Sequence, residues 1–179
     1  MTRCCRDQLI RVINNGKKQL IFKEISSPVG PLLLCADSHA LLSISWGSYR
    51  PPQSAPSTKS NALIETAIEQ LHEYFEGKRS VFALPMRLTG SPFQVRVWQT
   101  LQEIPFSKTT NYAHIAKTSG HEKAVRAVGT AIGKNPLPII IPCHRVIGTN
   151  GTLRGFAGGL DRKKILLDLE ARYQNQSNA

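Results

Sequence analysis

Residues 110–134 read TNYAHIAKTSGHEKAVRAVGTAIGK and contain two short helical patterns separated by a glycine. Asn111 is a suitable N-cap for the first pattern, and Gly120 can end it. The second pattern covers residues 122–134, with apolar positions for packing at Ala124, Val128, Ala131 and Ile132. Two short helices joined by a glycine-containing turn predict a helix-turn-helix. An ordinary helical hairpin with solvated Lys and Arg side chains is the alternative.

The positive charge of the chain is concentrated in the half that contains this segment. The net charge is +11, and residues 91–179 hold twelve basic and five acidic side chains, whereas residues 24–90 hold five and six. Lys123 and Arg126 belong to the second helical pattern, where the small residues Ala124 and Gly129 would let a partner approach closely. A basic half beside a neutral one indicates a polyanionic partner such as nucleic acid. A merely soluble basic protein remains the other interpretation.

The segments on either side of residues 110–134 carry clear local signals. Upstream, residues 91–94 (SPFQ) have the pattern of a capping box with proline at the first helical position. The helix that follows would bury Phe93, Val97 and Leu101. Downstream, prolines interrupt the apolar run 137–142 (LPIIIP), which predicts a rigid connector leading to Cys143. Asp161 is expected to cap a last helix, with Ile165, Leu166 and Leu169 inward.

The first half of the chain has a different pattern. Residues 19–25, 31–36 and 40–46 are short strand-like runs separated by turn residues, and they predict an antiparallel meander. A Pro/Ser-rich surface loop (49–60) and an amphipathic helix from about residue 61 follow. The expected fold class is therefore α+β, with a domain boundary in residues 84–91.

Length and composition exclude several classes of protein. A chain of 179 residues suits one domain or two small ones. It has no apolar run of the length that a membrane helix needs, and its basic first residues lack the apolar core of a secretory signal. We therefore expect a cytoplasmic protein with reduced thiols. Its four cysteines, Cys4, Cys5, Cys35 and Cys143, form no CxxC pair, so no zinc site is expected.

The dipeptide Cys143-His144 is the candidate chemical centre. A thiolate is a strong nucleophile, an imidazole can accept the thiol proton, and a carboxylate can orient the imidazole. Glu170 is the preferred carboxylate over Asp161. Because consecutive side chains diverge, a bridging water between the thiol and the imidazole is favoured over direct contact. A buried structural cysteine beside a surface histidine is the alternative.

Four motifs carry a resemblance to a known family. They are IPCHRVI at 141–147, RAVG at 126–129, Asn135-Pro136, and GFAGG at 155–159. At these spacings the chain is similar to the O6-alkylguanine-DNA alkyltransferases, or methylated-DNA–protein-cysteine methyltransferases, and most of all to their compact bacterial type. The resemblance runs from about residue 24 to residue 172. Phe156 stands where many members have Tyr, and Ala157 where some have Ser.

The resemblance implies a ribonuclease-H-like domain at 19–88 and a winged-helix-like helix-turn-helix domain at 89–174, between a flexible basic leader (1–18) and a tail (175–179). It implies a DNA repair protein that flips out O6-alkylguanine, and O4-alkylthymine, and transfers the alkyl group to its own cysteine. That suicide methyltransferase works once per molecule, without cofactor or metal. Its partner is double-stranded DNA containing alkylated bases, not a membrane, and it acts as a monomer.

The resemblance also assigns roles to individual residues. Cys143 matches the alkyl acceptor, and His144 and Glu170 match its water-linked relay. Tyr112 matches the residue that donates a proton to the departing base and that also meets the DNA by crowding the 3′ phosphate. Arg126 matches the residue that enters the base stack, and Asn135 the brace of the active-site turn. The groups that match those holding the base or meeting the DNA are the carbonyls of Cys143 and Val146, the amide of Ala157, and the DNA-facing Lys123, Ala124 and Gly129.

Three other functions remain to be weighed. A catalytically silent lesion binder would lack the acceptor cysteine, which this chain has in Cys143. A helix-turn-helix transcription factor of the same family would carry an additional zinc-binding domain. A Cys-His hydrolase would need an oxyanion hole and a substrate cleft, which the sequence does not specify.

Overall fold

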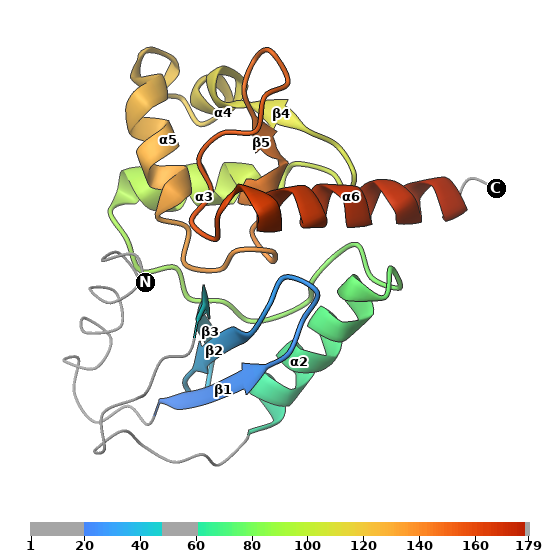
Figure 1. Cartoon of the computed structure of the whole chain (residues 1–179). Helices are drawn as coiled ribbons and strands as arrows, with labels where there is room; N and C mark the ends of the chain where they lie inside the picture. The colour runs from blue at the N-terminus through green and yellow to red at the C-terminus, as the bar shows by residue number, and fades with distance from the viewer. Residues whose placement is uncertain (1–19, 48–60, 178–179) are drawn as a thin grey trace. The chain divides into compact units, whose positions relative to one another are not determined.

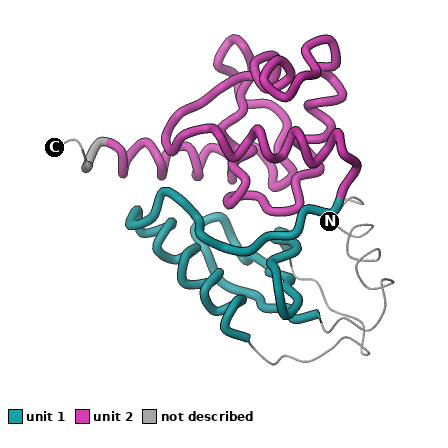
Figure 2. The backbone as a smooth tube through the Cα atoms, turned by 180° about the vertical axis from the view of Figure 1, so that it is seen from behind, with its two compact units in different colours: residues 1–89 teal, residues 90–179 magenta. Residues whose placement is uncertain are grey.

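The computed structural model describes residues 20–47 and 61–177. The chain forms two compact units, residues 1–89 and residues 90–179 (Figure 2). The leader (1–18) with Cys4 and Cys5, the loop 49–60 and the end of the tail lie outside the described residues.

Unit 1 is a three-stranded antiparallel sheet with one helix. The strands are β1 (Ile21–Ile25), β2 (Leu32–Ala36) and β3 (Leu41–Trp46), paired in the order β1-β2-β3, and helix α2 (Ala62–Phe75) packs against all three (Figure 1). The central strand β2 (LLLCA) is buried at every position, as expected for an apolar run without alternation. The predicted meander is confirmed.

The buried carboxylate of Asp37 links the segment around Arg87, near the end of unit 1, to the sheet. Asp37 Oδ1 accepts hydrogen bonds from the amides of His39 and Ala40 at 2.8 and 2.9 Å, and its Oδ2 pairs with Arg87. Burial alone would raise the pKa of Asp37, but these amides and the Arg87 guanidinium outweigh it and lower the pKa. The segment around Arg87 also bonds to β3 through the Arg87 amide and the Leu41 carbonyl, at 3.0 Å.

Unit 2 is mainly helical (Figure 1). Helix α3 (Pro92–Gln102) begins with the predicted capping box: the Ser91 amide donates to Gln94 Oε1 at 2.9 Å, and the Gln94 amide to Ser91 Oγ at 3.3 Å. The remaining elements, in chain order, are β4 (Thr110–Asn111), α4 (Tyr112–Thr118), η1 (Glu122–Ala124), α5 (Val125–Gly133), η2 (Cys143–Arg145), β5 (Val146–Ile147) and α6 (Leu160–Ser177).

The helix-turn-helix is present as α4 and α5. Asn111 caps α4, with its Oδ1 accepting from the His114 amide at 2.9 Å, and Gly120 adopts φ +80° at the turn. Trp98 of α3 is fully buried against the pair of helices α4 and α5. Its indole Nε1 donates to the Ala131 carbonyl at 2.9 Å. Ala124 differs from the expectation, because it ends the short helix η1 and is only half-buried.

Three further local predictions are wrong. Phe93 is half-buried and lies against the His121 ring in a tilted arrangement, with 4.6 Å between centroids, instead of entering the core. Asp161 does not cap α6, which already begins at Leu160. Ile165 is 37 % exposed, because α6 turns the row Lys163, Leu166, Leu169 and Glu170 inward.

Within the ranges 20–47 and 61–177, none of the helices is both long and apolar enough to cross a membrane.

Candidate active site around Cys143

The connector before Cys143 is a buried, braced loop. Asn135 is its brace: its Nδ2 donates to the Ile141 carbonyl at 2.8 Å, and its Oδ1 accepts from the Leu137 amide at 3.0 Å. Ile139 adopts φ +78°, which is rare for a β-branched residue and persists only where the surroundings enforce it. The loop thus delivers Cys143 at the start of η2 in one conformation.

The thiol of Cys143 is buried, with the residue 5 % exposed. Burial raises the pKa of Cys143 to about 11, while the Asn135 side chain and the charge of Lys163 act to lower it. The thiol is therefore protonated at neutral pH. A reaction that uses its thiolate needs a base nearby and a cation that stabilises the anion.

His144 supplies the basic nitrogen. Its Nε2 lies 2.8 Å from Glu170 Oε1, and both side chains are buried. An ionised carboxylate can only accept, so Nε2 carries the proton, and Nδ1 of the neutral ring is the acceptor. This Nδ1 is buried and has no hydrogen-bond partner within the described part of the chain. Burial lowers the pKa of His144 despite Glu170, so the ring is neutral at physiological pH.

Glu170 stays ionised although it is buried. Arg145 donates to both of its oxygens, with Nη2 at 2.9 Å from Oε1 and Nε at 3.0 Å from Oε2, and the Ser107 amide donates to Oε2 at 2.9 Å. Burial would raise the pKa of Glu170, but hydrogen bonds and charges from His144 and Arg145 hold it at about 2. Arg145 in turn donates through Nη1 to the Ile104 carbonyl at 2.6 Å. The carboxylate is thereby fixed on one side of His144.

Tyr112 approaches the same site from the helix-turn-helix. It follows β4, whose parallel pairing with β5 aligns Thr110 with Val146, three residues after Cys143. The Tyr112 hydroxyl donates to the Arg154 carbonyl at 2.9 Å. Burial, and secondly the charge of Cys143, raise the pKa of Tyr112, so its hydroxyl keeps a proton to donate.

Lys163 is a residue that sequence reasoning missed. It is fully buried on α6, and its Nζ donates to the carbonyls of Val146 and Arg154 at 2.6 and 2.7 Å. Burial lowers the pKa of Lys163 to about 8, and the charge of Cys143 acts against this. Within the DRKK run at 161–164 nothing marks this lysine, except its three-residue spacing from Leu166, which places it on the inward face.

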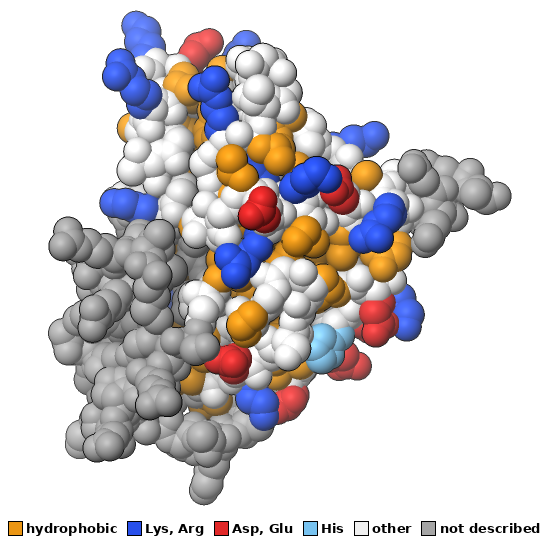
Figure 3. Space-filling model, in the orientation of Figure 1, with side chains coloured by type: hydrophobic (Ala, Val, Ile, Leu, Met, Phe, Trp, Pro, Cys, Tyr) orange, Lys and Arg blue, Asp and Glu red, His pale blue; other side chains and the backbone are white. Residues whose placement is uncertain are grey.

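The other predicted residues lie on the surface or at the edge of this cluster. Lys123 and Arg126 are exposed at the start of the second helix, and Lys and Arg side chains are visible over the upper part of unit 2 in Figure 3. Gly129 faces the Tyr112 ring, where a Cβ would lie 3.6 Å from Cδ1. Val146 is fully buried and Ala157 is exposed in the turn before α6.

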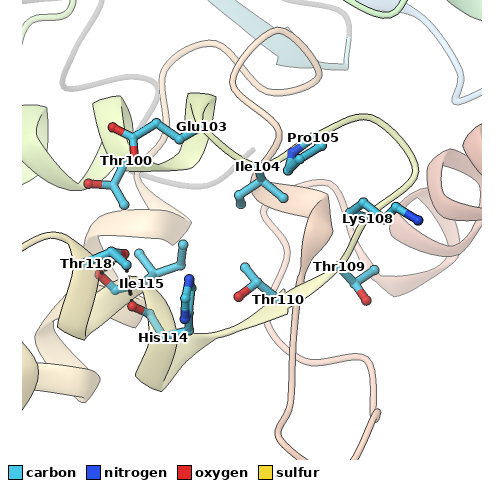
Figure 4. A pocket seen from close by; sticks show the side chains of 10 residues that line it. All are labelled: Thr100, Glu103, Ile104, Pro105, Lys108, Thr109, Thr110, His114, Ile115 and Thr118. Atoms are coloured by element: carbon cyan, nitrogen blue, oxygen red, sulfur yellow. Dashed lines mark hydrogen bonds between the residues drawn. The ribbon is translucent and has the colours of Figure 1, made fainter.

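A separate cavity of about 410 Å³ lies between α3, α4 and the segment that joins α3 to β4 (Figure 4). Its lining includes Ile104, Thr110 and His114. None of the predicted site residues lines it. Among the described residues, no three His, Cys, Asp or Glu side chains are grouped so that they could hold a metal ion.

Comparison with known proteins gives a consistent result for both units. Residues 20–88 match the family described as 6-O-methylguanine DNA methyltransferase, ribonuclease-like domain, and residues 92–172 match its DNA binding domain. The chain is 42 % identical over 158 residues to the methylated-DNA–protein-cysteine methyltransferase of Mycolicibacterium paratuberculosis, covering 87 % of this chain and 95 % of the relative.

Two further relatives agree. The inducible methylated-DNA–protein-cysteine methyltransferase of Bacillus subtilis is 45 % identical over 131 residues, 73 % of each chain. A crystal structure of Mycobacterium tuberculosis OGT in complex with DNA matches with a TM-score of 0.78 and 39 % identity, covering 86 % of this chain and 94 % of that one.

A helix-turn-helix joined to a buried Cys-His-Glu array defines a DNA-repair alkyltransferase. The chain belongs to the 6-O-methylguanine-DNA methyltransferase family, with an α+β fold that includes the ribonuclease-like domain.

Proposed function

We propose that this protein repairs alkylated double-stranded DNA by moving the alkyl group from O6 of guanine, or O4 of thymine, to Cys143. The observation that carries the proposal is the buried Cys143, followed directly by a neutral His144 whose Nδ1 is unpartnered within the described chain. Residues 89–174 would bind the DNA and accept the alkyl group, and residues 19–88 would form the ribonuclease-H-like domain.

Activation of Cys143 requires a path for its proton. With Nε2 committed to Glu170 at 2.8 Å, His144 Nδ1 is the available base, and one water between Sγ and Nδ1 can carry the proton. Glu170 stabilises the imidazolium that forms, because Arg145 and the Ser107 amide keep the carboxylate ionised. Lys163 then stabilises the thiolate that remains.

The transfer step exchanges one bond for another. The Cys143 thiolate attacks the alkyl carbon, a carbon–sulfur bond forms, and the carbon–oxygen bond breaks with its electron pair on the base oxygen. The leaving base then needs a proton, which the Tyr112 hydroxyl supplies and regains from solvent, while the proton on His144 is released. General acid help of this kind is worth roughly 10²–10⁴ in rate.

The target atom lies inside a stacked duplex, so the nucleotide must leave the stack first. Arg126, exposed on α5, would fill the gap, and Lys123 would meet phosphate. The half-buried Ala124 and Gly129 present little bulk to the duplex. In the pocket, the carbonyls of Cys143 and Val146 and the Ala157 amide would hold the base, with Asn135 bracing the turn.

The product limits each molecule to one reaction. A thioether has no acidic proton and is a poor leaving group, so His144 and Glu170 cannot regenerate the thiol. One thiol per lesion also means that a single chain suffices and that the protein works as a monomer. Because the thiol must be reduced, a cytoplasmic location fits the chemistry.

Intact-protein mass measurement after mixing with an O6-methylguanine duplex tests the proposal. The expected result is a gain of one methyl group per molecule, located on the peptide that contains Cys143 and absent from the Cys143→Ala variant. Cys35→Ala is the matched control, because burial raises the pKa of Cys35 to about 12 in unit 1 and keeps that thiol inert. Repeated turnover, or a methyl group on another cysteine, contradicts the mechanism.

A further inference from the structure

The loop between β5 and α6 places a free guanidinium beside the candidate site. Arg154 is exposed, and its Nε donates to Thr152 Oγ1 at 3.3 Å. Its two terminal nitrogens have no hydrogen-bond partner among residues 20–47 and 61–177. The sequence from 148 to 159 (GTNGTLRGFAGG) contains no acidic residue that could neutralise the charge locally.

Internal hydrogen bonds fix the conformation of this loop. The Gly148 amide donates to the Thr152 carbonyl at 2.8 Å, and Thr152 Oγ1 donates to Asn150 Oδ1 at 2.7 Å. A Cβ at position 148 would come within 2.8 Å of Thr152 Oγ1, so the turn requires glycine there. The Arg154 carbonyl is held by Lys163 Nζ at 2.7 Å. Arg154 is therefore presented from a fixed backbone.

The position of Arg154 is set by Tyr112, which lies between two segments. On one side, a Cβ on Gly129 of α5 would meet the Tyr112 ring at 3.6 Å, and on the other, a Cβ on Gly155 would meet its hydroxyl at 3.4 Å. The Tyr112 hydroxyl also donates to the Arg154 carbonyl at 2.9 Å, so the backbone of Arg154 lies directly at this side chain. Arg154 and the middle of α5 therefore both lie beside Tyr112.

We propose that Arg154 binds a backbone phosphate of the lesion-bearing strand, beside Tyr112. A nucleotide rotated out of the duplex stays linked to its two phosphates, so both arrive with it at the entrance of the site. A guanidinium with two free donor groups matches phosphate in a bidentate way, and the contact would fix the register of the strand without reading sequence. This inference rests on the proposed function for the substrate, an alkylated duplex.

The side chain and the backbone of Arg154 have separate roles, so a substitution can remove the guanidinium without removing the carbonyl. The carbonyl that accepts from Tyr112 and Lys163 is retained in Arg154→Ala, so the site keeps its geometry and only the guanidinium is lost. Arg154→Lys keeps the charge. Arg172→Ala is the matched control, since Arg172 is also exposed and lies nine residues beyond Lys163 on α6, about 13 Å along the helix.

The first measurement is binding to a short duplex that contains one O6-methylguanine, between about 50 and 200 mM salt, with every variant carried in a Cys143→Ala background so that no transfer occurs. Each phosphate contact makes the decrease of log affinity with log salt steeper by about 0.9. At 0.1 M salt, the loss of one contact corresponds to an affinity that is about eightfold lower. We expect Arg154→Ala to lose about one contact, and Arg154→Lys and Arg172→Ala to keep the slope of the unchanged protein. Equal slopes for Arg154→Ala and Arg172→Ala overturn the proposal.

The second measurement is single-turnover transfer from an O6-methylguanine duplex, from an O6-carboxymethylguanine duplex and from the free base O6-benzylguanine. At subsaturating protein, Arg154→Ala should slow both duplex reactions equally and spare the free base, which has no phosphate. An equal loss on the free base would place the side chain in the chemistry, and a loss confined to the carboxymethyl lesion would assign it to the carboxylate of the adduct. Either result overturns the proposal.

Failure of the unchanged protein to take up a methyl group would instead contradict the proposed function, since the salt slopes are measured without any transfer.

Discussion

The carboxylate of Glu170 lies 2.8 Å from His144 Nε2 and fixes which ring nitrogen of the histidine is basic. Glu170 is 1 % exposed and His144 is fully buried, so neither side chain can exchange this partner for solvent without local opening. The contact therefore couples the stability of unit 2 to the protonation state of its candidate site.

The first prediction concerns acid. Burial lowers the pKa of His144 below the value of about 6.5 that it has when unfolded, so the unfolded chain binds its proton first. The free energy of unfolding should therefore fall below about pH 6.5, by up to about 1.4 kcal/mol per pH unit. Urea unfolding at a series of pH values measures this.

Glu170 extends the acid effect to lower pH. Its pKa is about 2 in the folded protein and about 4.3 when unfolded, so its contribution is full above about pH 4.3 and is lost as the pH falls towards 2. The loss amounts to about 3 kcal/mol. A flat profile of the unchanged protein from pH 7 to 5 would argue against a buried neutral His144.

Tyr112→Phe should slow alkyl transfer. The substitution removes the proposed proton donor and its hydrogen bond to the Arg154 carbonyl, while Phe keeps the ring between α5 and the loop. The expected loss is roughly 10²–10⁴ in single-turnover rate, with a stability loss of only about 0.5–1.5 kcal/mol. An unchanged rate would remove Tyr112 from the acid role.

Arg126→Ala should separate base flipping from chemistry. Arg126 is exposed on α5, away from the buried cluster around Cys143, so its loss should slow repair in a duplex. Reaction with free O6-benzylguanine requires no flipping and should be nearly unaffected. Comparable losses on both substrates would point to a role in the chemistry or to misfolding.

Lys163→Met tests the buried cation. Without its charge the pKa of Cys143 should rise further, and a rise of about one unit would slow thiolate-dependent transfer about tenfold. Lys164→Met is the matched control: the neighbouring lysine is exposed and pairs with Asp168 at 2.6 Å. If both variants react at the rate of the unchanged protein, the cation has no part in stabilising the thiolate.

Replacement by alanine should change the stability of the protein in opposite directions at two glycines. A Cβ on Gly90 would lie 2.7 Å from the buried Trp98 ring, so Gly90→Ala should destabilise the protein by about 1–3 kcal/mol. Gly133, at the end of α5, has nothing within 4 Å of such a Cβ, and Gly133→Ala should stabilise it by up to about 1 kcal/mol. Thermal unfolding of the two variants measures both signs, and destabilisation of the same size in each would contradict the contact with Trp98.

Features that depend only on neighbouring residues were predictable from the amino-acid sequence. The capping box at Ser91, the Asn111 cap and the glycine turn of the helix-turn-helix are local, because each is a hydrogen bond or a backbone angle within a few positions. The Cys143-His144 pair was also recognisable, since a reactive dipeptide and its surrounding motif are contiguous.

Which polar side chains are buried, and what they bind, follows from packing between segments that are far apart in the chain. The spacing from Leu166 places Lys163 on the inward face of α6, but it does not show that a charged side chain can be buried there, because the carbonyls that satisfy the ammonium come from positions 146 and 154. Glu170 was chosen from the sequence, but its ionisation depends on Arg145 and on the Ser107 amide, 63 residues away. A buried charge is stable only where its partners converge, and that convergence arises from packing between segments that are distant in the chain.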